Sequence, residues 1–259
     1  MNEELIFSVA DNVAVIQVNR PGARNALNWA AQEGFAQAVT AVSADPTLRA
    51  LIITGSGTQS FVAGGDLKEL NNHADAESAQ RLYKVMNEAL QQLTMLPIPV
   101  IGAVNGDAFG GGCEILTACD LRIASENARF SFAQIRNGLT TGWGGTGRLV
   151  RLLGQSRAME LLLTGRVFSA AEAQQMGFVH RLTAEPVLAA AQAWAAELVA
   201  LPRGALAGLK QLVGAAGERP LAEVNALEQQ LFAELWPQPD HVEAMQAFVE
   251  KRPPVFNRE

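Results

Sequence analysis

Cysteine and histidine are scarce in this chain of 259 residues, which narrows the chemistry it can carry. The two cysteines are too few for a disulfide framework and too widely spaced for the C-x-x-C pattern of a zinc or redox site. The three histidines are scattered, without partners at metal-ligand spacing. These residues are Cys113, Cys119, His73, His180 and His241. We therefore expect no metal site, and we expect both cysteines to be small buried residues in a reducing cytoplasm.

Basic charge and long apolar runs are also lacking. The formal net charge is −6, the pI is about 5.2, and no run of lysine and arginine is longer than two. A nucleic-acid-binding protein carries a basic patch or stripe, and a membrane span needs about eighteen or more consecutive apolar residues. Residues 1–12 lack the basic and apolar regions of a signal peptide. We expect a cytoplasmic protein that binds neither nucleic acid nor membrane.

Hydrophobic residues are plentiful, at 49% of the chain, so a sizeable core is expected. A β-hairpin is predicted within residues 4–19, and apolar stripes predict helices over about 29–42 and 75–96. Strands and helices alternate through residues 1–185, whereas residues 186–259 show only helical stripes. The pattern predicts an α/β core with a C-terminal helical region, and its loose repeat suggests a recurring βα unit.

One glycine-rich motif matches the pattern of a dinucleotide site but lacks the secondary structure that such a site needs. Residues 142–147, GWGGTG, fit the G-x-G-x-x-G pattern of a dinucleotide site. That site needs a hydrophobic strand directly before the first glycine, and residues 136–141, RNGLTT, do not form one. No serine stands in a nucleophile-elbow context either. A tight turn onto a packed helix is the better interpretation.

Two other glycine-rich turns each follow a buried strand. Residues 61–66, FVAGGD, follow the strand at 49–55, and residues 109–114, FGGGCE, follow the strand at 99–106. Backbone N–H groups at a helix start are unpaired and lie at its electropositive end. Two such groups that converge can stabilise negative charge on a carbonyl oxygen, with Glu114 nearby for proton transfer. The alternative is two ordinary turns in which Glu114 merely favours the helix start.

At these residues the sequence resembles the enoyl-CoA hydratase/isomerase (crotonase) superfamily. The matching segments occur in the family's order and spacing and span nearly the whole chain. They are residues 19–28, 61–70, 105–125, 142–154 and 248–256. The resemblance implies a right-handed spiral of ββα units with C-terminal helices, assembled as trimers or pairs of trimers. It also implies an acyl-CoA thioester substrate, whose enolate would be held by the N–H groups of Gly65 and Gly111.

The resemblance extends to further residues and implies no cofactor beyond the coenzyme A of the substrate. Phe248 and Lys251 match an aromatic and basic pair that contacts the CoA adenine and its phosphate, often from a neighbouring subunit. A core position for Phe248 and a solvated charge for Lys251 are the alternatives. The residues expected to contact substrate or coenzyme A are Arg24, Ala26, Ala63, Gly64, Asp66, Leu67, Lys68, Trp143, Phe248 and Lys251.

The sequence departs from the family's hydratases at one catalytic position. These use two glutamates; the first falls on Glu114, but the second falls on Gln134, which can hold water but cannot exchange a proton at neutral pH. Hydration with a single glutamate, double-bond isomerisation and decarboxylation of a malonyl-type thioester all remain open. Trp143 and Trp236 resemble the ethylmalonyl-CoA decarboxylase branch, although both could be core residues. A non-catalytic RNA-binding or interaction protein is disfavoured by the acidic charge and the intact Gly65, Gly111 and Glu114 set.

Overall fold

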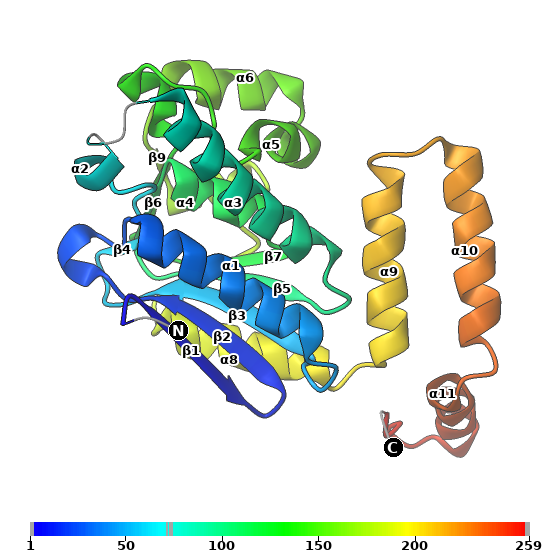
Figure 1. Ribbon diagram of the computed structural model, residues 1–259. Helices are drawn as coiled ribbons and strands as arrows, with labels where there is room; N and C mark the ends of the chain where they lie inside the picture. Colours follow the sequence, from blue (N-terminus) through cyan, green and yellow to red (C-terminus); the bar gives the residue numbers. More distant parts are fainter. Residues whose placement is uncertain (1–2, 71, 73–74, 257–259) are drawn as a thin grey trace.

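The computed structural model describes residues 3–70, 72 and 75–256, and His73 lies outside them. Its larger sheet has six strands in the order β1-β2-β3-β5-β7-β10 (Figure 1). The strands run parallel except for β1, which pairs antiparallel with β2. Their bounds are β1 Leu5–Ala10, β2 Val13–Val18, β3 Ala50–Gly55, β5 Val100–Val104, β7 Leu121–Ser125 and β10 Arg181–Thr183.

The β1–β2 hairpin predicted from the sequence is confirmed. Its two turn residues, Asp11 and Asn12, have φ angles of 49° and 61°. A two-residue turn with positive φ at both positions matches the right-handed twist of the flanking strands, and asparagine and aspartate adopt that conformation readily. The turn therefore fixes the register in which Leu5 pairs with Val18.

A smaller sheet has the order β4-β6-β8-β9. Its bounds are β4 Ser60–Val62, β6 Asp107–Phe109, β8 Arg129–Ser131 and β9 Phe168–Ser169. Along the chain, β3, β5 and β7 of the larger sheet are each followed by a strand of the smaller one and then by a helix. The predicted spiral of ββα units is confirmed. One detail of the prediction is wrong, because Phe109 ends strand β6 instead of lying in a turn.

Helices cover both faces of the larger sheet. Helices α1 and α3 lie over one face, and α8 packs on the other, where Trp194 belongs to the same cluster as Ile52 and Ile101 (Figure 1). The last strand ends at Thr183, but α8, which follows it, is still part of this packing. The bounds are α1 Trp29–Ala44, α2 Leu67–Leu70, α3 Ala76–Met95, α4 Gly111–Ala118, α5 Gly145–Leu153, α6 Gln155–Thr164, α7 Ala170–Gln175 and α8 Val187–Val199.

Helix α3 shows how the sequence sets the elements around the glycine turns. Asp75 caps its N-terminus by accepting a hydrogen bond from the Ser78 N–H at 2.8 Å. Its buried stripe includes Met86, Leu90 and Leu93, at the spacing of one helix face. The predicted helix at residues 75–96 is confirmed.

The last three helices form an arm beside the two sheets (Figure 1). They are α9 Arg203–Ala216, α10 Leu221–Leu235 and α11 Pro239–Glu250. Helix α10 has no buried residue, and even its large aromatic side chain, Phe232, is 63% exposed. We call α9, α10 and α11 the C-terminal arm. Among the described residues, no helix is long and apolar enough to cross a bilayer.

Candidate active site

The two glycine-rich turns meet, because strands β4 and β6, which lead into them, pair side by side. Gly64 has a φ of 95°, and a Cβ placed there would lie 3.2 Å from the Gly111 nitrogen. A Cβ on Gly112 would lie 2.0 Å from the Val62 carbonyl oxygen. Both positions require glycine, the first for its backbone angle and the second for the close approach. The glycines therefore bring the N-terminus of α4 against the end of β4.

Two N–H groups at this junction, those of Gly65 and Gly111, have no hydrogen-bond acceptor among the described residues. Gly111 is the first residue of α4, where the helix supplies no partner for the N–H. The turn containing Gly65 pairs with Leu27 through the Gly64 carbonyl and the Asp66 N–H, at 2.8 and 2.9 Å, which leaves the Gly65 N–H out of the pairing. Within the part of the chain that the structure describes, neither N–H donates to another residue. The junction can therefore offer two donors to an oxygen atom.

Glu114 lies in the first turn of α4, with 1% of the residue exposed. Its carboxylate accepts backbone hydrogen bonds from Gly142 at 3.1 Å and from Trp143 and Gly145 at 2.8 Å each. A fourth bond comes from the side-chain amide of Gln134, at 2.7 Å. The turn before α5, whose glycines resembled a nucleotide motif, thus binds a carboxylate of the protein itself.

Gln134 lies in the short 3₁₀ segment Ala133–Asn137 and has one open polar atom. Its nitrogen donates to Glu114, while its oxygen Oε1 is buried and has no hydrogen-bond partner among the described residues. A buried acceptor without a donor is rare, so such an atom marks a place for a water or a ligand group. The sequence places Gln134 at the site but does not predict its bond to Glu114.

Trp143 is a buried side chain with 3% exposure, as the core interpretation expects. Its ring packs on Gly111, where a Cβ would lie 2.2 Å from the ring atom Cζ3. The other tryptophan that the sequence singles out, Trp236, is 53% exposed and lies beyond the end of α10. A core position for Trp236 is therefore wrong, and only Trp143 is next to the glycine turns.

Arg148 is a residue of the site that the sequence analysis misses. Its guanidinium donates to the Thr117 hydroxyl at 3.0 Å and to the Trp143 carbonyl at 2.7 Å, which joins α4 to α5. Burial lowers the pKa of Arg148, and the nearby charge of Glu114 opposes this effect. The only sequence signal is a basic residue on a helix that follows a glycine-rich turn.

The residues expected along the coenzyme A path divide into two groups. Arg24 and Ala26 lie beside the turn at Ala63, whose N–H donates to the Arg24 carbonyl at 3.2 Å. Leu67 and Lys68 are exposed on α2, directly after that turn.

Phe248 and Lys251 are not brought to the glycine turns within one chain. They lie on and after α11, in the C-terminal arm (Figure 1). Phe248 is 86% exposed, so its interpretation as a core side chain is wrong. Both cysteines are free and buried, as expected.

The ββα spiral, the glycine turns that meet at the start of α4 and the buried carboxylate in the first turn of that helix define an enzyme of the crotonase fold. The family model described as enoyl-CoA hydratase/isomerase matches residues 8–259. The mitochondrial enoyl-CoA hydratase of Pongo abelii is 40% identical over 93% of this chain and 82% of its own length. The short-chain-enoyl-CoA hydratase of Clostridium acetobutylicum is 37% identical over 96% of this chain and 95% of its own length.

Solved structures agree with the sequence relatives. The crystal structure of an enoyl-CoA hydratase from Bacillus anthracis superposes with a TM-score of 0.93 at 32% identity, covering 99% of this chain and 100% of that one. This chain belongs to the enoyl-CoA hydratase/isomerase family. It is an acyl-CoA enzyme of that type, so the non-catalytic interpretation left open by the sequence is not supported.

Proposed function

We propose that the enzyme binds an acyl-CoA thioester and stabilises its enolate between the N–H groups of Gly65 and Gly111. The observation that carries this proposal is the pair of unpaired N–H groups at the junction of the two glycine turns. Backbone donors held in place before the reaction stabilise charge that develops on a carbonyl oxygen, and each one commonly contributes about a hundredfold or more in rate. Glu114 then moves the proton at the carbon next to the thioester.

The hydrogen bonds of Glu114 indicate how it becomes available. A carboxylate has about four acceptor sites, and four N–H groups occupy them here. Three of these donors are backbone groups held by the start of α5, whereas the fourth is a side chain that can rotate. We infer that Gln134 turns aside when substrate binds and opens one acceptor site on Oε1 of Glu114, which keeps its hydrogen bond from Gly142. In hydration, the open oxygen of Gln134 would accept a hydrogen bond from the attacking water.

The remaining parts of the proposal concern binding and assembly. Arg24 and Lys68 are exposed cations beside the first glycine turn, where they suit the phosphates of coenzyme A. We propose that no other cofactor is needed and that the enzyme acts in the cytoplasm. Phe248 and Lys251 would reach the nucleotide of a neighbouring protomer. The exposed apolar side chains of the C-terminal arm support a homotrimer or homohexamer.

Decarboxylation of a malonyl-type thioester is the second candidate. In that reaction CO₂ leaves, the electron pair of the broken C–C bond becomes the enolate, and a proton then returns to the carbon. No base is needed, which fits a Glu114 carboxylate already occupied by four donors and a Gln134 that cannot exchange a proton. The ring of Trp143 on Gly111 is the second feature that favours this candidate.

Mass spectrometry of products from a mixed acyl-CoA panel separates these reactions. The panel holds short and medium 2-enoyl-CoAs, 3-enoyl-CoAs, and methylmalonyl- and ethylmalonyl-CoA. Gain of water, or a shift of the double bond between 3-enoyl and 2-enoyl products, supports the first proposal. Loss of CO₂ with the enoyl-CoAs untouched establishes the decarboxylase instead. No change in any thioester that binds contradicts both.

A further inference from the structure

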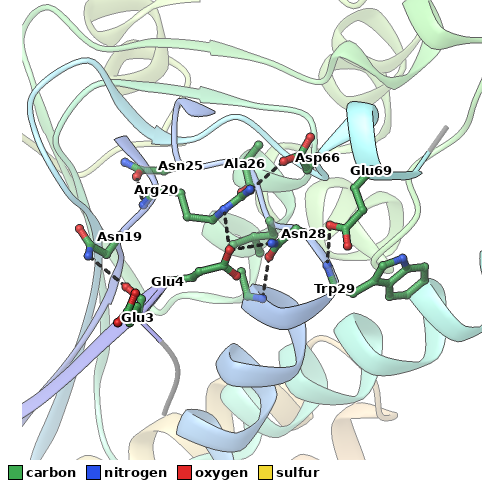
Figure 2. Close-up of polar contacts among 12 residues, drawn as sticks. Glu3, Glu4, Asn19, Arg20, Asn25, Ala26, Asn28, Trp29, Asp66 and Glu69 are labelled. Atoms are coloured by element: carbon green, nitrogen blue, oxygen red, sulfur yellow. Dashed lines mark hydrogen bonds and ion pairs between the residues drawn. The ribbon is translucent and has the colours of Figure 1, made fainter. Parts of the chain in front are cut away.

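Arg20 is the centre of a polar network beside the first glycine turn, and the reaction as proposed assigns it no role. Figure 2 shows its guanidinium between Glu4 and Asp66, which belong to segments far apart in the sequence. The ion-pair distances are 3.3 Å from Nε to Glu4 and 2.9 Å from Nη1 to Asp66. All three side chains are largely buried, with exposures of 17%, 29% and 15% for Arg20, Glu4 and Asp66.

The same guanidinium nitrogen contacts both sides of the backbone pairing that holds Gly65. Besides Asp66, Nη1 of Arg20 donates to the carbonyl of Ala26. Leu27 and Gly65 form the β-bridge between the two segments. Ala26 is the residue before Leu27, and Asp66 is the residue after Gly65. Arg20 therefore bridges the two segments next to the Leu27–Gly65 pair. Two backbone hydrogen bonds, from Leu27 to Gly64 and from Asp66 to Leu27, hold that pair.

A backbone contact to Asn25 holds Arg20 itself in place. Its backbone N–H donates to the Asn25 side chain at 3.0 Å, and the Asn25 amide donates to the carbonyls of Ser56 and Ser60. Ser60 begins β4, the strand that leads into the first glycine turn. The arginine is thus tied, through Asn25, to the strand that leads into the turn containing Gly65.

The chemistry of the network requires an arginine. A guanidinium is a rigid planar fork that can donate to several acceptors at once, whereas a lysine ammonium sits on a flexible stem. Here the guanidinium pairs with the carboxylates of Glu4 and Asp66 and donates to the Ala26 carbonyl at the same time. Within the described part of the chain, Glu4 already has one buried carboxylate oxygen without a hydrogen-bond partner, so the network has no spare donor for it. Removing Arg20 would leave two largely buried carboxylates without their cation.

We propose that Arg20 is a positioning residue that, through Asp66 and Ala26, sets the direction of the Gly65 N–H toward the substrate carbonyl. This inference rests on the proposed function, because it concerns one of the two donors that hold the enolate. Arg20 does not touch the substrate. Its effect is on polarisation of the thioester carbonyl, which depends on the distance and the direction of the donor.

Infrared spectroscopy of bound butyryl-CoA, labelled with ¹³C at the thioester carbonyl, tests the inference. A hydrogen bond to the carbonyl oxygen lowers its stretching frequency, so the wild-type enzyme is expected to shift the band downward. Arg20→Lys keeps the charge but loses the fork, and it should show a smaller downshift together with a kcat about tenfold lower. Arg166→Lys is the matched control, since Arg166 also pairs with two carboxylates, Glu160 and Glu172, and should change neither quantity.

The outcomes separate the inference from the proposed function. A wild-type downshift that Arg20→Lys preserves, even with reduced thermal stability, means that Arg20 is only structural and overturns the inference. No downshift in the wild-type enzyme overturns the proposed pair of donors and the inference with it. If Arg20→Lys does not fold, Asp66→Asn breaks the ion pair but keeps an acceptor. The same loss of downshift is expected there, and an unchanged band contradicts the inference.

Discussion

At the scale of single residues, Glu114 combines a chemical and a structural role. Glu114→Gln replaces one carboxylate oxygen with an NH₂ group. Each of the two carboxylate oxygens accepts from two N–H donors, so the new NH₂ group would face two donors in either orientation. We expect the rate of product formation to fall at least about a hundredfold, because the amide cannot transfer the proton. We also expect a loss of about 1–3 kcal/mol in the free energy of unfolding, because donors are left unpaired. Steady-state kinetics and urea denaturation measure the two effects, and a variant with near-wild-type rate would remove Glu114 from the mechanism.

Gln134→Glu tests whether the missing second carboxylate limits hydration. The new carboxylate would take the place of the Gln134 nitrogen, which is 2.7 Å from Glu114. Two carboxylates this close repel each other when both are ionised, so the pair would hold one proton with a raised pKa. Hydratase activity should rise and acquire a bell-shaped pH dependence.

The two neighbouring carboxylates also make the stability of the Gln134→Glu variant depend on pH. An acid whose pKa is raised on folding favours the folded state at low pH, and that contribution is lost as the pH rises through the folded-state pKa. The variant should therefore lose stability relative to wild type as the pH increases. No gain in hydration at any pH would show that the pocket is built for other chemistry.

The sequence predicts the candidate site residues that lie in local patterns. Gly65, Gly111 and Glu114 stand at the starts of turns and helices that follow strands, and the structure brings their segments together. The donors to Glu114 and the role of Arg148 could not be predicted. They come from a turn and helix elsewhere in the chain, and only the packing of α5 against α4 places them there.

At the scale of elements, α4 depends on glycine for its contact with Trp143. Gly111→Ala puts a Cβ 2.2 Å from the ring, so we expect it to cost about 1–3 kcal/mol in the free energy of unfolding. In a Trp143→Ala background the same change should cost less, because the ring is gone. Gly147→Ala, in α5 with nothing within 4 Å of the added Cβ, is the control and should be neutral or stabilising. Equal costs for Gly111→Ala in both backgrounds would contradict this packing.

Elements with a clear period are predictable, whereas the short strand β6 is not. The buried stripe and Asp75 cap of α3, and the Asp11-Asn12 turn of the hairpin, follow from local rules. Strand β6 has only three residues, Asp107–Phe109, which is too short for an alternating pattern. It forms because the chain runs between β4 and β8, and that neighbourhood is set by the whole spiral.

At the scale of the whole molecule, a largely buried ion pair joins the C-terminal arm to the core. Lys210 of α9 contacts Asp120 at 2.7 Å and donates to the Ile98 carbonyl at 3.0 Å. Burial raises the pKa of Asp120, while the charge of Lys210 opposes this. Asp120 thus favours the folded state most at low pH, and the contribution is lost as the pH rises through its folded-state pKa.

Lys210→Met removes the cation and raises the pKa of Asp120 further. We expect a loss of about 2 kcal/mol at neutral pH, and a larger deficit relative to wild type at about pH 8 than at about pH 5. Arg151→Met breaks the exposed pair with Glu218 and should cost well under about 1 kcal/mol. Urea denaturation at the two pH values measures both variants. A deficit that does not grow with pH would show that Asp120 gains nothing from its partner.

If Gly65 and Gly111 hold a thioester enolate while Glu114 moves its proton, the enzyme should exchange the C2 proton of a saturated thioester with solvent. The most direct test is deuterium exchange at C2 of saturated butyryl-CoA, incubated with the enzyme in D₂O and followed by mass spectrometry. We expect the wild-type enzyme to incorporate deuterium at C2, and we expect Glu114→Gln to lower the rate of incorporation at least about a hundredfold. Butyryl-CoA that binds without any exchange, or exchange that is unchanged in Glu114→Gln, would contradict this mechanism.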